Sequence, residues 1–419
     1  MIFGLCDVNN FYVSCERSFN PALNNRPVIV LSNNDGCAVA RSNEVKALGV
    51  KMGTPVHQIK GLIRQHDIKV FSSNYVLYAD MSNRFRSIMN EYTPDVEEYS
   101  CDECFLGLDG FGHKNLIQYM HKMVRQLRVG VGLPVCVGLA TSKTLSKVAN
   151  HHAKSLQIPG SVLALFNDLQ IKNALENLPV NEIWGVGRKH TEHLNKLGIN
   201  TALQLRDADL KWIRKRFSVV MERTIMELRG ESCIEINNMP EKKKQIVCTR
   251  SMANKTDDYQ VLRKAVATHV DHACEKLRRQ GSVAKYISVM LRTNGFSKGD
   301  RQYYPNLTLQ LQYPSDDTRE FTHAAMLGLD RIYRSEYLFK KCGVMLSDIS
   351  DKGVVQYDLF KPKPKRSDDL MSAFDKINSR FGSGTVQSAS VGFDKPFAMR
   401  ANHTSPRFTS KWSDIIQAR

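Results

Sequence analysis

Short apolar runs alternate with helical patterns along the first part of the chain. A short apolar run bounded by turn residues is typical of a strand in the core of a sheet. Such runs predict strands over 2–8, 28–32 and 136–142. Apolar residues spaced along one helix face predict helices from Ser73 onward, over 113–128 and over 143–154. The sequence VEEYSCDECFLGLDG, residues 96–110, predicts two strands joined by a tight acidic turn.

The order of these elements predicts a fold. Strand, helix, two strands, helix and strand correspond to a split βαββαβ, or ferredoxin-like, sheet. The segment between the first strand and the first long helix would then be an inserted subdomain. This pattern indicates an α+β chain, but a fold alone implies no function.

The second half of the chain indicates further domains. Short helical patterns surround Gly185 and Gly187. The polar sequence NNMPEKKKQ, from Asn237, is typical of an interdomain linker. Strands and two long helices then alternate over 246–348, which predicts a second mixed α/β unit. A charged, proline-containing spacer and a short tail to Arg419 complete the chain.

Composition adds a preference for an acidic partner. The 419 residues are 42% hydrophobic and 24% charged, as in ordinary globular proteins, and the formal net charge is +17. Residues 1–110 contain 10 basic and 13 acidic side chains, a net of −3, so the remaining residues carry +20. This charge favours a polyanion such as nucleic acid, although a merely soluble basic protein is the alternative.

Other patterns suggest the compartment. The chain has no apolar run of about 18 residues and no signal-like beginning, so we expect a cytosolic protein. The ten cysteines then indicate reduced thiols. Cys101 and Cys104 have C-x-x-C spacing, but strand-like flanks favour packing over a zinc or redox role.

Three carboxylates are the first candidates for chemistry. Asp7 ends the first strand, and Asp102 and Glu103 lie in the turn between two later strands. In a split βαββαβ sheet these strands are neighbours, so the acids could converge. Converging carboxylates favour Mg²⁺, and two such ions about 4 Å apart can support phosphoryl transfer. Three solvated turn acids are the alternative.

Aromatic and basic residues surround these acids in the sequence. Phe11 and Tyr12 follow the first strand, where a ring could pack on a sugar or a base, or simply on the core. The inserted segment carries two cations, Arg41 and Lys46. Lys143 and Lys147 share a helix face, and could bind a triphosphate or form a solvated face.

The motifs carrying these residues resemble one known family. The sequences CDVNNFYVSCE, SNNDGCAVARSNEVKALGVKMGTP, SNYVLYADMSNR, YSCDECF, TSKTLSKVANHHAK and WGVG are similar to those of Y-family DNA polymerases. The resemblance extends through the tail SPRFTSKWSD, which is closer to the UmuC-like branch and its plasmid-borne relatives than to the shorter-tailed DinB type.

The resemblance implies a role for each matching residue. Asp7, Asp102 and Glu103 would be catalytic and, with the Val8 carbonyl, would bind two Mg²⁺ ions. Tyr12 would be a steric gate that excludes the ribose 2′-hydroxyl, with Phe11 under the sugar. The remaining expected contacts to the incoming nucleotide are Arg41, Lys46 and Lys147. The family acidic motif S-I-D-E-A-F is here Ser100 to Phe105, with cysteines at two positions, which affects local packing but leaves both acids.

The resemblance also predicts a domain plan. Residues 1–10 and 75–165 would form the palm and residues 11–74 small fingers. A thumb with a helix-hairpin-helix would follow at 166–232, a linker at 233–242 and a little finger at 243–350. Residues 351–419 would contain a clamp-binding peptide and a partner-binding tail.

Two regions are expected to contact DNA. Gly185, Gly187 and Arg188 would form a hairpin whose backbone N–H groups approach a phosphate. Residues 241–300 have 13 basic and 6 acidic side chains, a net of +7, which suits contact with a sugar–phosphate backbone. The peptide containing Gln356, Leu359 and Phe360 resembles a sliding-clamp motif.

The predicted function is therefore error-prone translesion DNA synthesis in the SOS response. Primer–template DNA, deoxynucleoside triphosphates, a sliding clamp, a processed UmuD-like dimer and RecA are the implied partners. A bacterial cytosolic location, at the nucleoid when active, is also implied. The alternatives are a DinB-like polymerase acting alone, a non-catalytic DNA-binding regulator and a metal-dependent nuclease.

Overall fold

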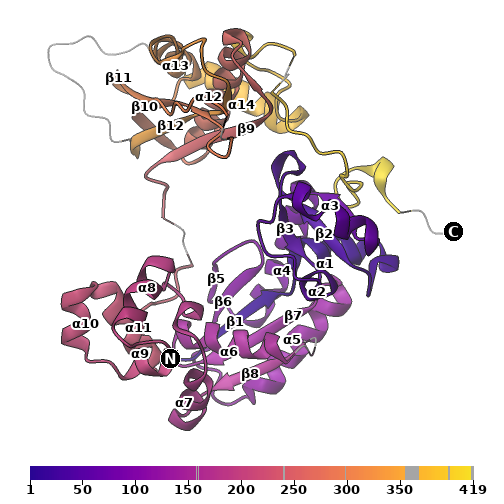
Figure 1. The fold of residues 1–419 in the computed structure, drawn as a ribbon, viewed down its shortest axis with the longest axis vertical. Coiled ribbons are helices and arrows are strands. Elements are labelled where there is room, and N and C mark those ends of the chain that lie inside the picture. Colours follow the sequence, from indigo (N-terminus) through magenta and orange to yellow (C-terminus); the bar gives the residue numbers. More distant parts are fainter. Residues whose placement is uncertain are drawn as a thin grey trace. The chain divides into compact units, whose positions relative to one another are not determined.

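The computed structural model describes residues 1–156, 158, 160–238, 241–297, 299–353, 368–394 and 397–416. The described residues divide into two units. The N-terminal unit contains 1–32, 36–238 and 402–416, and the C-terminal unit contains 33–35 and 241–401. Figure 1 shows their secondary structure. Among these residues, every helix is too short or too polar to cross a membrane.

A five-stranded sheet forms the centre of the N-terminal unit. Its strands are arranged in the order β5 (Val96–Glu98), β6 (Glu103–Gly107), β1 (Phe3–Val8), β7 (Val135–Ala140) and β8 (Val162–Leu165). Neighbouring strands are antiparallel, except for the parallel pair β7 and β8. The first four of these strands have the predicted ferredoxin-like arrangement, and the α+β fold class is confirmed.

Helices cover both faces of this sheet. Cys6 and Val8 of β1 face a core that includes residues of α4 (Tyr75–Tyr92) and α5 (Leu116–Gly130). Helix α6 (Lys143–Ser155) packs against β1, β7 and β8. The approach of α6 requires glycine at 138, because a Cβ there would lie 2.2 Å from the Ser146 carbonyl oxygen. Thus α6 is held close to the strands that bear the acids.

The predicted insertion between β1 and α4 is confirmed, with more structure than expected. Its three-stranded sheet has the order β3 (Ala38–Arg41), β2 (Val28–Leu31) and β4 (Lys69–Ser72). The helices here are α1 (Phe11–Phe19), α2 (Asn43–Ala47) and α3 (Val56–Gln65), with short 3₁₀ turns η1 (Pro21–Leu23) and η2 (Asn33–Asp35). Asn10 has a φ of 50°, a left-handed conformation that asparagine tolerates, and turns the chain from β1 into α1.

A small helical group follows β8. It contains α7 (Asp168–Glu176), η3 (Val180–Glu182), α8 (Arg188–Lys196), α9 (Ala202–Asp207), α10 (Leu210–Arg216) and α11 (Val219–Leu228). Their apolar residues share a core with α6 and β8. The fully buried Glu227 of α11 accepts hydrogen bonds from Thr144 N at 2.9 Å and Cys233 N at 2.7 Å. This carboxylate therefore joins the helical group to the beginning of α6.

The C-terminal unit contains a four-stranded antiparallel sheet with one covered face. The strand order is β11 (Asn306–Ser315), β10 (Ser282–Thr293), β12 (Phe339–Asp351) and β9 (Ile246–Thr256). Helices α12 (Tyr259–Arg279) and α13 (Thr318–Ile332) share a core with its apolar side chains. Along β11 the leucines at 307, 309 and 311 face that core, and the polar residues between them are exposed. This alternation leaves the other face of the sheet open.

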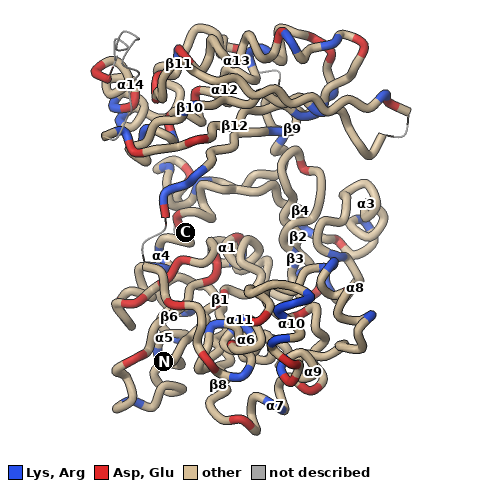
Figure 2. Tube along the Cα trace, turned by 90° about the vertical axis from the view of Figure 1, so that its left-hand side faces the viewer, with Lys and Arg blue, Asp and Glu red and all other residues tan. Residues whose placement is uncertain are grey.

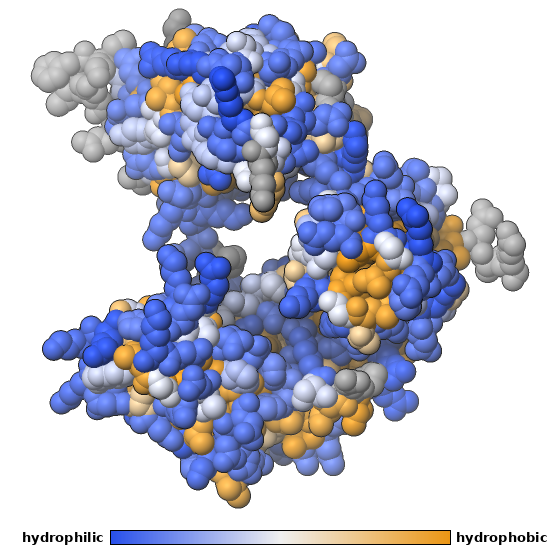
Figure 3. Space-filling view, in the orientation of Figure 1, coloured by the Kyte–Doolittle hydropathy of each residue, from blue (hydrophilic) through white to orange (hydrophobic). Residues whose placement is uncertain are grey.

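The last part of the chain contributes to both units. Helix α14 (Asp368–Phe381) joins the C-terminal unit, where Asp375 forms an ion pair at 2.7 Å with Arg278 of α12. The turn η4 (Ala389–Val391) also contacts α12. Residues 402–416, including η5 (Trp412–Asp414), instead belong to the N-terminal unit. In Figure 3 the visible surface is largely hydrophilic, with apolar residues in a few patches.

Candidate active site

Backbone pairing brings the three predicted acids to one end of the central sheet. Asp7 of β1 lies directly opposite Glu103 of β6 in the antiparallel register. The neighbouring Val8 N–H donates to the Asp102 carbonyl oxygen at 2.9 Å. Asp7 and Glu103 are 96 positions apart in sequence, but they are neighbours because β1 and β6 are adjacent strands. The expected convergence is therefore a consequence of the strand register.

Lysines from α6 pair with two of these acids. Lys154 Nζ lies 2.6 Å from Asp7 Oδ2, and Lys147 Nζ lies 3.1 Å from Glu103 Oε2. The third acid, Asp102, accepts a hydrogen bond from Ser100 Oγ at 2.6 Å. These contacts balance part of the negative charge at the end of the sheet.

The electrostatics of Asp7 and Glu103 are coupled. Burial raises the pKa of Asp7 to about 8, with Lys154 acting against this shift and Glu103 adding to it. Burial also acts to raise the pKa of Glu103, but hydrogen bonds with Asp7 and Lys147 bring it below its ordinary value. A proton held by Asp7 and shared with Glu103 accounts for the raised pKa of Asp7 and the lowered pKa of Glu103. Two adjacent carboxylates thus need positive charge to be ionised together.

The donor set fits a hard divalent cation. Carboxylate and backbone carbonyl oxygens are the ligands that Mg²⁺ prefers. In the conformation described, the acids are turned toward lysine or serine. Within the described part of the chain, no three His, Cys, Asp or Glu side chains are grouped as metal ligands. An ion bound here would be held by carboxylates on strands whose register already places them at one end of the sheet.

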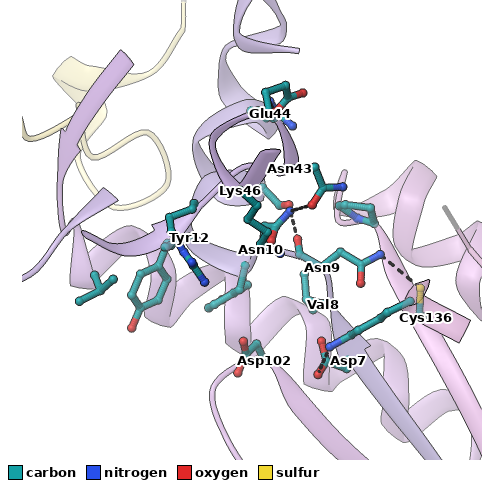
Figure 4. Close-up of a pocket in the computed structure, with 18 of the residues that line it drawn as sticks. Asp7, Val8, Asn9, Asn10, Tyr12, Asn43, Glu44, Lys46, Asp102 and Cys136 are labelled. Atoms are coloured by element: carbon teal, nitrogen blue, oxygen red, sulfur yellow. Dashed lines mark hydrogen bonds and ion pairs between the residues drawn. The ribbon is translucent and has the colours of Figure 1, made fainter. Parts of the chain in front are cut away.

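A cavity of about 730 Å³ opens over two of these acids, Asp7 and Asp102, while Glu103 does not line it (Figure 4). Its lining includes eight residues of interest here: Asp7, Val8, Phe11, Tyr12, Arg41, Lys46, Asp102 and Lys154. The close-up shows Asp7 and Asp102 at its floor, with Tyr12 to one side and Lys46 above. Acidic, aromatic and basic groups from separate elements therefore meet around one space.

The basic residues give one side of this cavity a positive charge. Arg41 Nη1 donates to the Val50 carbonyl oxygen at 2.8 Å, while its buried Nε has no hydrogen-bond partner among the described residues. Burial lowers the pKa of Lys46, and the neighbouring Arg41 and Lys154 lower it further. Cations this close to one another repel, and a bound anion would relieve the repulsion.

The aromatic residues at the cavity differ in exposure. Phe11 is buried, and Tyr12 is half-buried. The Tyr12 ring stacks on Tyr78 of α4, with ring centroids 4.3 Å apart and an angle of 15°. Burial raises the pKa of Tyr12, so its hydroxyl stays protonated at neutral pH. A neutral ring in a fixed orientation therefore borders the space above the acids.

Two lysines that sequence analysis grouped together differ in position. Lys147 lies beside Glu103, and its Nζ is 4.1 Å from the centroid of the Tyr99 ring, but it does not line the cavity. Lys143 is 1% exposed, pairs with Glu97 at 2.5 Å and donates to the Glu235 carbonyl oxygen. The buried Lys143 therefore has a structural role.

The predicted DNA-contact residues lie at a separate helical hairpin. Gly185 has a φ of +89°, which favours glycine, and a Cβ at Gly185 or Gly187 would have no neighbour within 4 Å. Arg188 begins α8, and its side chain is largely exposed, 3.7 Å from Glu192. The hairpin thus has an accessible backbone. Gln356, Leu359 and Phe360 lie outside the described residues.

Sequence reasoning missed three residues at the site. Lys154 is seven positions after Lys147, two helical turns along the same face, and this spacing could have identified it. Tyr78 and Glu16 had no comparable signal, because their contacts depend on how α1 and α4 pack. The ten cysteines are free thiols. Cys104 is buried in the core, as predicted, but Cys101 is exposed and lines the cavity, so the expected packing applies to only one of the pair.

Family comparisons agree with this arrangement. Residues 6–151 match the impB/mucB/samB family, and residues 243–359 match the impB/mucB/samB family C-terminal domain. Residues 170–199 match the IMS family HHH motif, and residues 368–418 match a domain of unknown function, DUF4113. The chain belongs to the impB/mucB/samB family.

Full-length relatives identify the branch. The chain is 41% identical over 422 residues to Protein UmuC and 42% identical over 424 residues to Protein SamB, both of Salmonella typhimurium. Each alignment covers 100% of both proteins. DNA polymerase IV of Moorella thermoacetica is 27% identical over 396 residues, 92% of this chain and 94% of its own. The impB/mucB/samB chain described here is thus a Y-family DNA polymerase of the UmuC-like branch.

Solved structures confirm the fold. A Y-family DNA polymerase chimera of Dbh and Dpo4 matches 84% of this chain and 100% of its own, with a TM-score of 0.68 and 19% identity. DinB from Sulfolobus solfataricus matches the same shares with a TM-score of 0.52 and 18% identity.

Proposed function

We propose that this error-prone translesion DNA polymerase transfers nucleotides at the cavity above Asp7, Asp102 and Glu103. The observation that carries the proposal is the meeting of these acids, at the end of β1 and β6, with an aromatic wall and a cluster of cations. The acids and the Val8 carbonyl would hold two Mg²⁺ ions. When bound, such ions stabilise the charge that develops during phosphoryl transfer.

The cations of the cavity would bind and orient the triphosphate. Arg41, Lys46 and Lys154 line the same space as the acids, so their charge acts on a phosphate chain placed there. Lys147 contacts Glu103 and would hold that carboxylate in position, and a direct contact between Lys147 and the nucleotide stays a prediction.

The aromatic wall would select the sugar. Tyr12 lines the cavity, and its ring is fixed on one face by Tyr78. A ring in this position leaves little room beside C2′ of a bound sugar, so a 2′-hydroxyl would collide with it. The buried Phe11 would support the same wall from below.

DNA would be held by surfaces outside the cavity. The hairpin at Gly185, Gly187 and Arg188 would bind backbone phosphate through N–H groups. The neighbouring helix α10 has the sequence LKWIRKR, and Figure 2 shows this run of basic residues. These contacts read no bases, which suits synthesis on any template.

The open sheet of the C-terminal unit would provide a second backbone contact. Arg292 of β10 and Lys341 of β12 are register partners on this sheet. Like charges opposite each other are destabilising. Neither side chain forms an ion pair within the part of the chain that the structure describes, so both are free for phosphate. We therefore assign 243–350 as the little finger. The other proposed domains are a palm at 1–10 and 75–165, fingers at 11–74 and a thumb at 166–232.

The proposed partners extend beyond DNA and deoxynucleoside triphosphates. The peptide with Gln356, Leu359 and Phe360 would bind a sliding clamp. A processed UmuD-like dimer and RecA would assemble with the chain in the bacterial cytosol, at the nucleoid. The similarity to Protein UmuC along the full length supports these partners.

Primer extension tests the proposal. The full chain, with Mg²⁺, should extend a primer across an abasic site. The assay is run both with and without activated RecA and the UmuD-like dimer. Asp102→Asn should lose extension while still binding primer–template DNA. The control is Asp109→Asn, which changes an exposed acid beyond the other end of β6 and should retain extension. Normal extension by Asp102→Asn would refute the assignment of the site.

A further inference from the structure

The C-terminal tail, residues 402–416, is anchored next to the beginning of α4. His403 and Ser72 exchange two hydrogen bonds: Ser72 N donates to the His403 carbonyl oxygen at 3.0 Å, and His403 N donates to Ser72 Oγ at 3.0 Å. Further along the tail, Phe408 stacks on Phe19 at the end of α1, with centroids 4.9 Å apart and an angle of 10°. The tail therefore contacts α1 and the end of β4, next to the beginning of α4.

Asn74 links the tail to the first turn of α4. Its Oδ1 accepts from Leu77 N at 3.3 Å and caps the helix. Its Nδ2 donates to the carbonyl oxygen and the Oγ of Ser405, both at 3.0 Å. The side chain is 3% exposed, so water cannot easily replace either contact. One buried amide thus holds the helix start and the tail together.

Ser405 passes this contact to a buried carboxylate. Glu16 of α1 is 2% exposed, and its Oε1 accepts from Ser405 Oγ at 3.0 Å and from Tyr78 OH at 2.7 Å. Burial raises the pKa of Glu16, and these two hydrogen bonds oppose the shift. A buried carboxylate depends strongly on its donors, so each hydroxyl helps to fix where Glu16 and its partners lie.

The contact chain ends at the proposed sugar gate. Tyr78, whose hydroxyl is held by Glu16, is the ring on which Tyr12 stacks. Tyr12 also lies one helical turn before Glu16 on α1. The orientation of the Tyr12 ring therefore depends on α1 and on Tyr78, and Ser405 of the tail contacts the residue that joins them.

We propose that the C-terminal tail, through Ser405, Glu16 and Tyr78, positions Tyr12 and so contributes to the exclusion of ribonucleotides. The inference rests on the proposed role of Tyr12 as the sugar gate. This positioning role would be a function for part of the domain of unknown function at 368–418. Ser405, Glu16 and Tyr78 are positioning residues, because they act on the substrate only through Tyr12.

The test is the ratio of ribonucleotide to deoxynucleotide insertion by the full chain. Ser405→Ala removes one donor to Glu16, and this ratio should rise about three- to tenfold, the range of a single hydrogen bond. Tyr78→Phe keeps the stacked ring, loses the other donor and should give a similar rise. Ser405→Thr retains a hydroxyl and should restore a low ratio. Ser413→Ala is the control, since Ser413 lies in the same tail and contacts Asp414.

A double variant separates this inference from the proposed function. If Ser405 acts through Tyr12, adding Ser405→Ala to Tyr12→Ala should leave the high ratio of Tyr12→Ala unchanged. A rise with Tyr12→Ala but none with Ser405→Ala and Tyr78→Phe would refute the role of the tail and leave the sugar gate standing. No rise with Tyr12→Ala would refute both. A lower melting temperature without a change in the ratio would show that the tail only anchors the chain.

Discussion

The two large sheets of this polymerase differ in what covers them. The five-stranded sheet has α4 and α5 on one face and α6 on the other, and its candidate site lies at the ends of two strands. The four-stranded sheet has α12 and α13 on one face and an open second face. The proposed function would therefore be confined to an end of one sheet and spread over a face of the other.

This difference sets how each sheet should respond to change. At the covered sheet, a few buried charges act together, and the removal of one leaves its partners uncompensated. At the open sheet, each cation would make a separate and modest contribution to the proposed DNA binding. Single substitutions should abolish activity in the first case and weaken it gradually in the second.

The largest effect is expected where α6 meets the covered sheet. Gly138→Ala would place a Cβ 2.2 Å from the Ser146 carbonyl oxygen and 2.3 Å from Asn150 N, so α6 would have to move. We expect a loss of about 3 kcal/mol or more of stability, with loss of primer extension, because Lys154 moves with the helix. Thermal denaturation and primer extension measure these effects.

Gly61→Ala is the matched control for this change. Gly61 lies within α3, where a Cβ would have no neighbour within 4 Å. Alanine should therefore stabilise that helix by roughly 0.5–1 kcal/mol. Equal stability of the two variants would contradict the close packing of α6 on β7.

The next effect concerns one residue of the covered site. Tyr12→Ala should raise ribonucleotide relative to deoxynucleotide insertion on the order of tenfold to a hundredfold, because the ring no longer occupies the space of a 2′-hydroxyl. Tyr12→Phe keeps the ring and should retain a low ratio. Single-nucleotide insertion kinetics measure both, and an unchanged ratio in Tyr12→Ala would move the gate to another residue.

The sequence predicted the covered sheet well because its signals are local. Strand β1 was expected over 2–8 and is found at Phe3–Val8. The turn between β5 and β6 lies where the pattern put it, but only Asp102 lies in that turn, because Glu103 begins β6. Helix α6 was expected over 143–154 and is found at Lys143–Ser155. Because β1 and β6 are adjacent strands, Asp7 comes next to Asp102 and Glu103, so this part of the site could be inferred from the sequence.

Other features were not predictable, for physical reasons. Helix α1 follows a left-handed Asn10 and has no side-chain cap, so its beginning has no recognisable signal. Strand β3 is four residues long, with only alternate residues buried. The contact of Ser405 with Glu16 joins residues 389 positions apart, and no local pattern encodes it. The predicted domain boundaries and the clamp peptide stay predictions.

An intermediate effect is expected on the helix-covered side of the second sheet. Burial lowers the pKa of His269 of α12 to about 4, with Arg250 and His272 adding to the shift. Its unfolded pKa is about 6.5, so between pH 6.5 and 4 the unfolded chain binds more protons than the folded chain. Stability is therefore complete above pH 6.5 and falls by about 3 kcal/mol as pH decreases toward 4.

Removal of the imidazole tests this assignment. His269→Gln should flatten the decrease in stability between pH 6.5 and 4, as measured by denaturant unfolding at a series of pH values. His323→Gln, at an exposed position of α13, should leave the decrease unchanged. A steep decrease that persists in His269→Gln would show that another group is responsible, and that the interior beneath α12 does not hold a neutral imidazole.

The smallest effect per residue is expected on the open face. Arg292→Gln together with Lys341→Gln removes a facing pair of cations. DNA binding should weaken roughly tenfold at moderate salt, equally for all sequences, and the slope of log affinity against log salt should become shallower by about 2.

The control pair Arg331→Gln and Lys376→Gln removes the same charge from exposed positions of α13 and α14. If the control pair changed the slope equally, only the total charge of the unit would matter, and the open face would lose its role as the DNA contact. If only the open-face pair changes the slope, DNA binding at the open face is the sum of individual phosphate contacts. The covered sheet differs, because its few charged groups depend on one another.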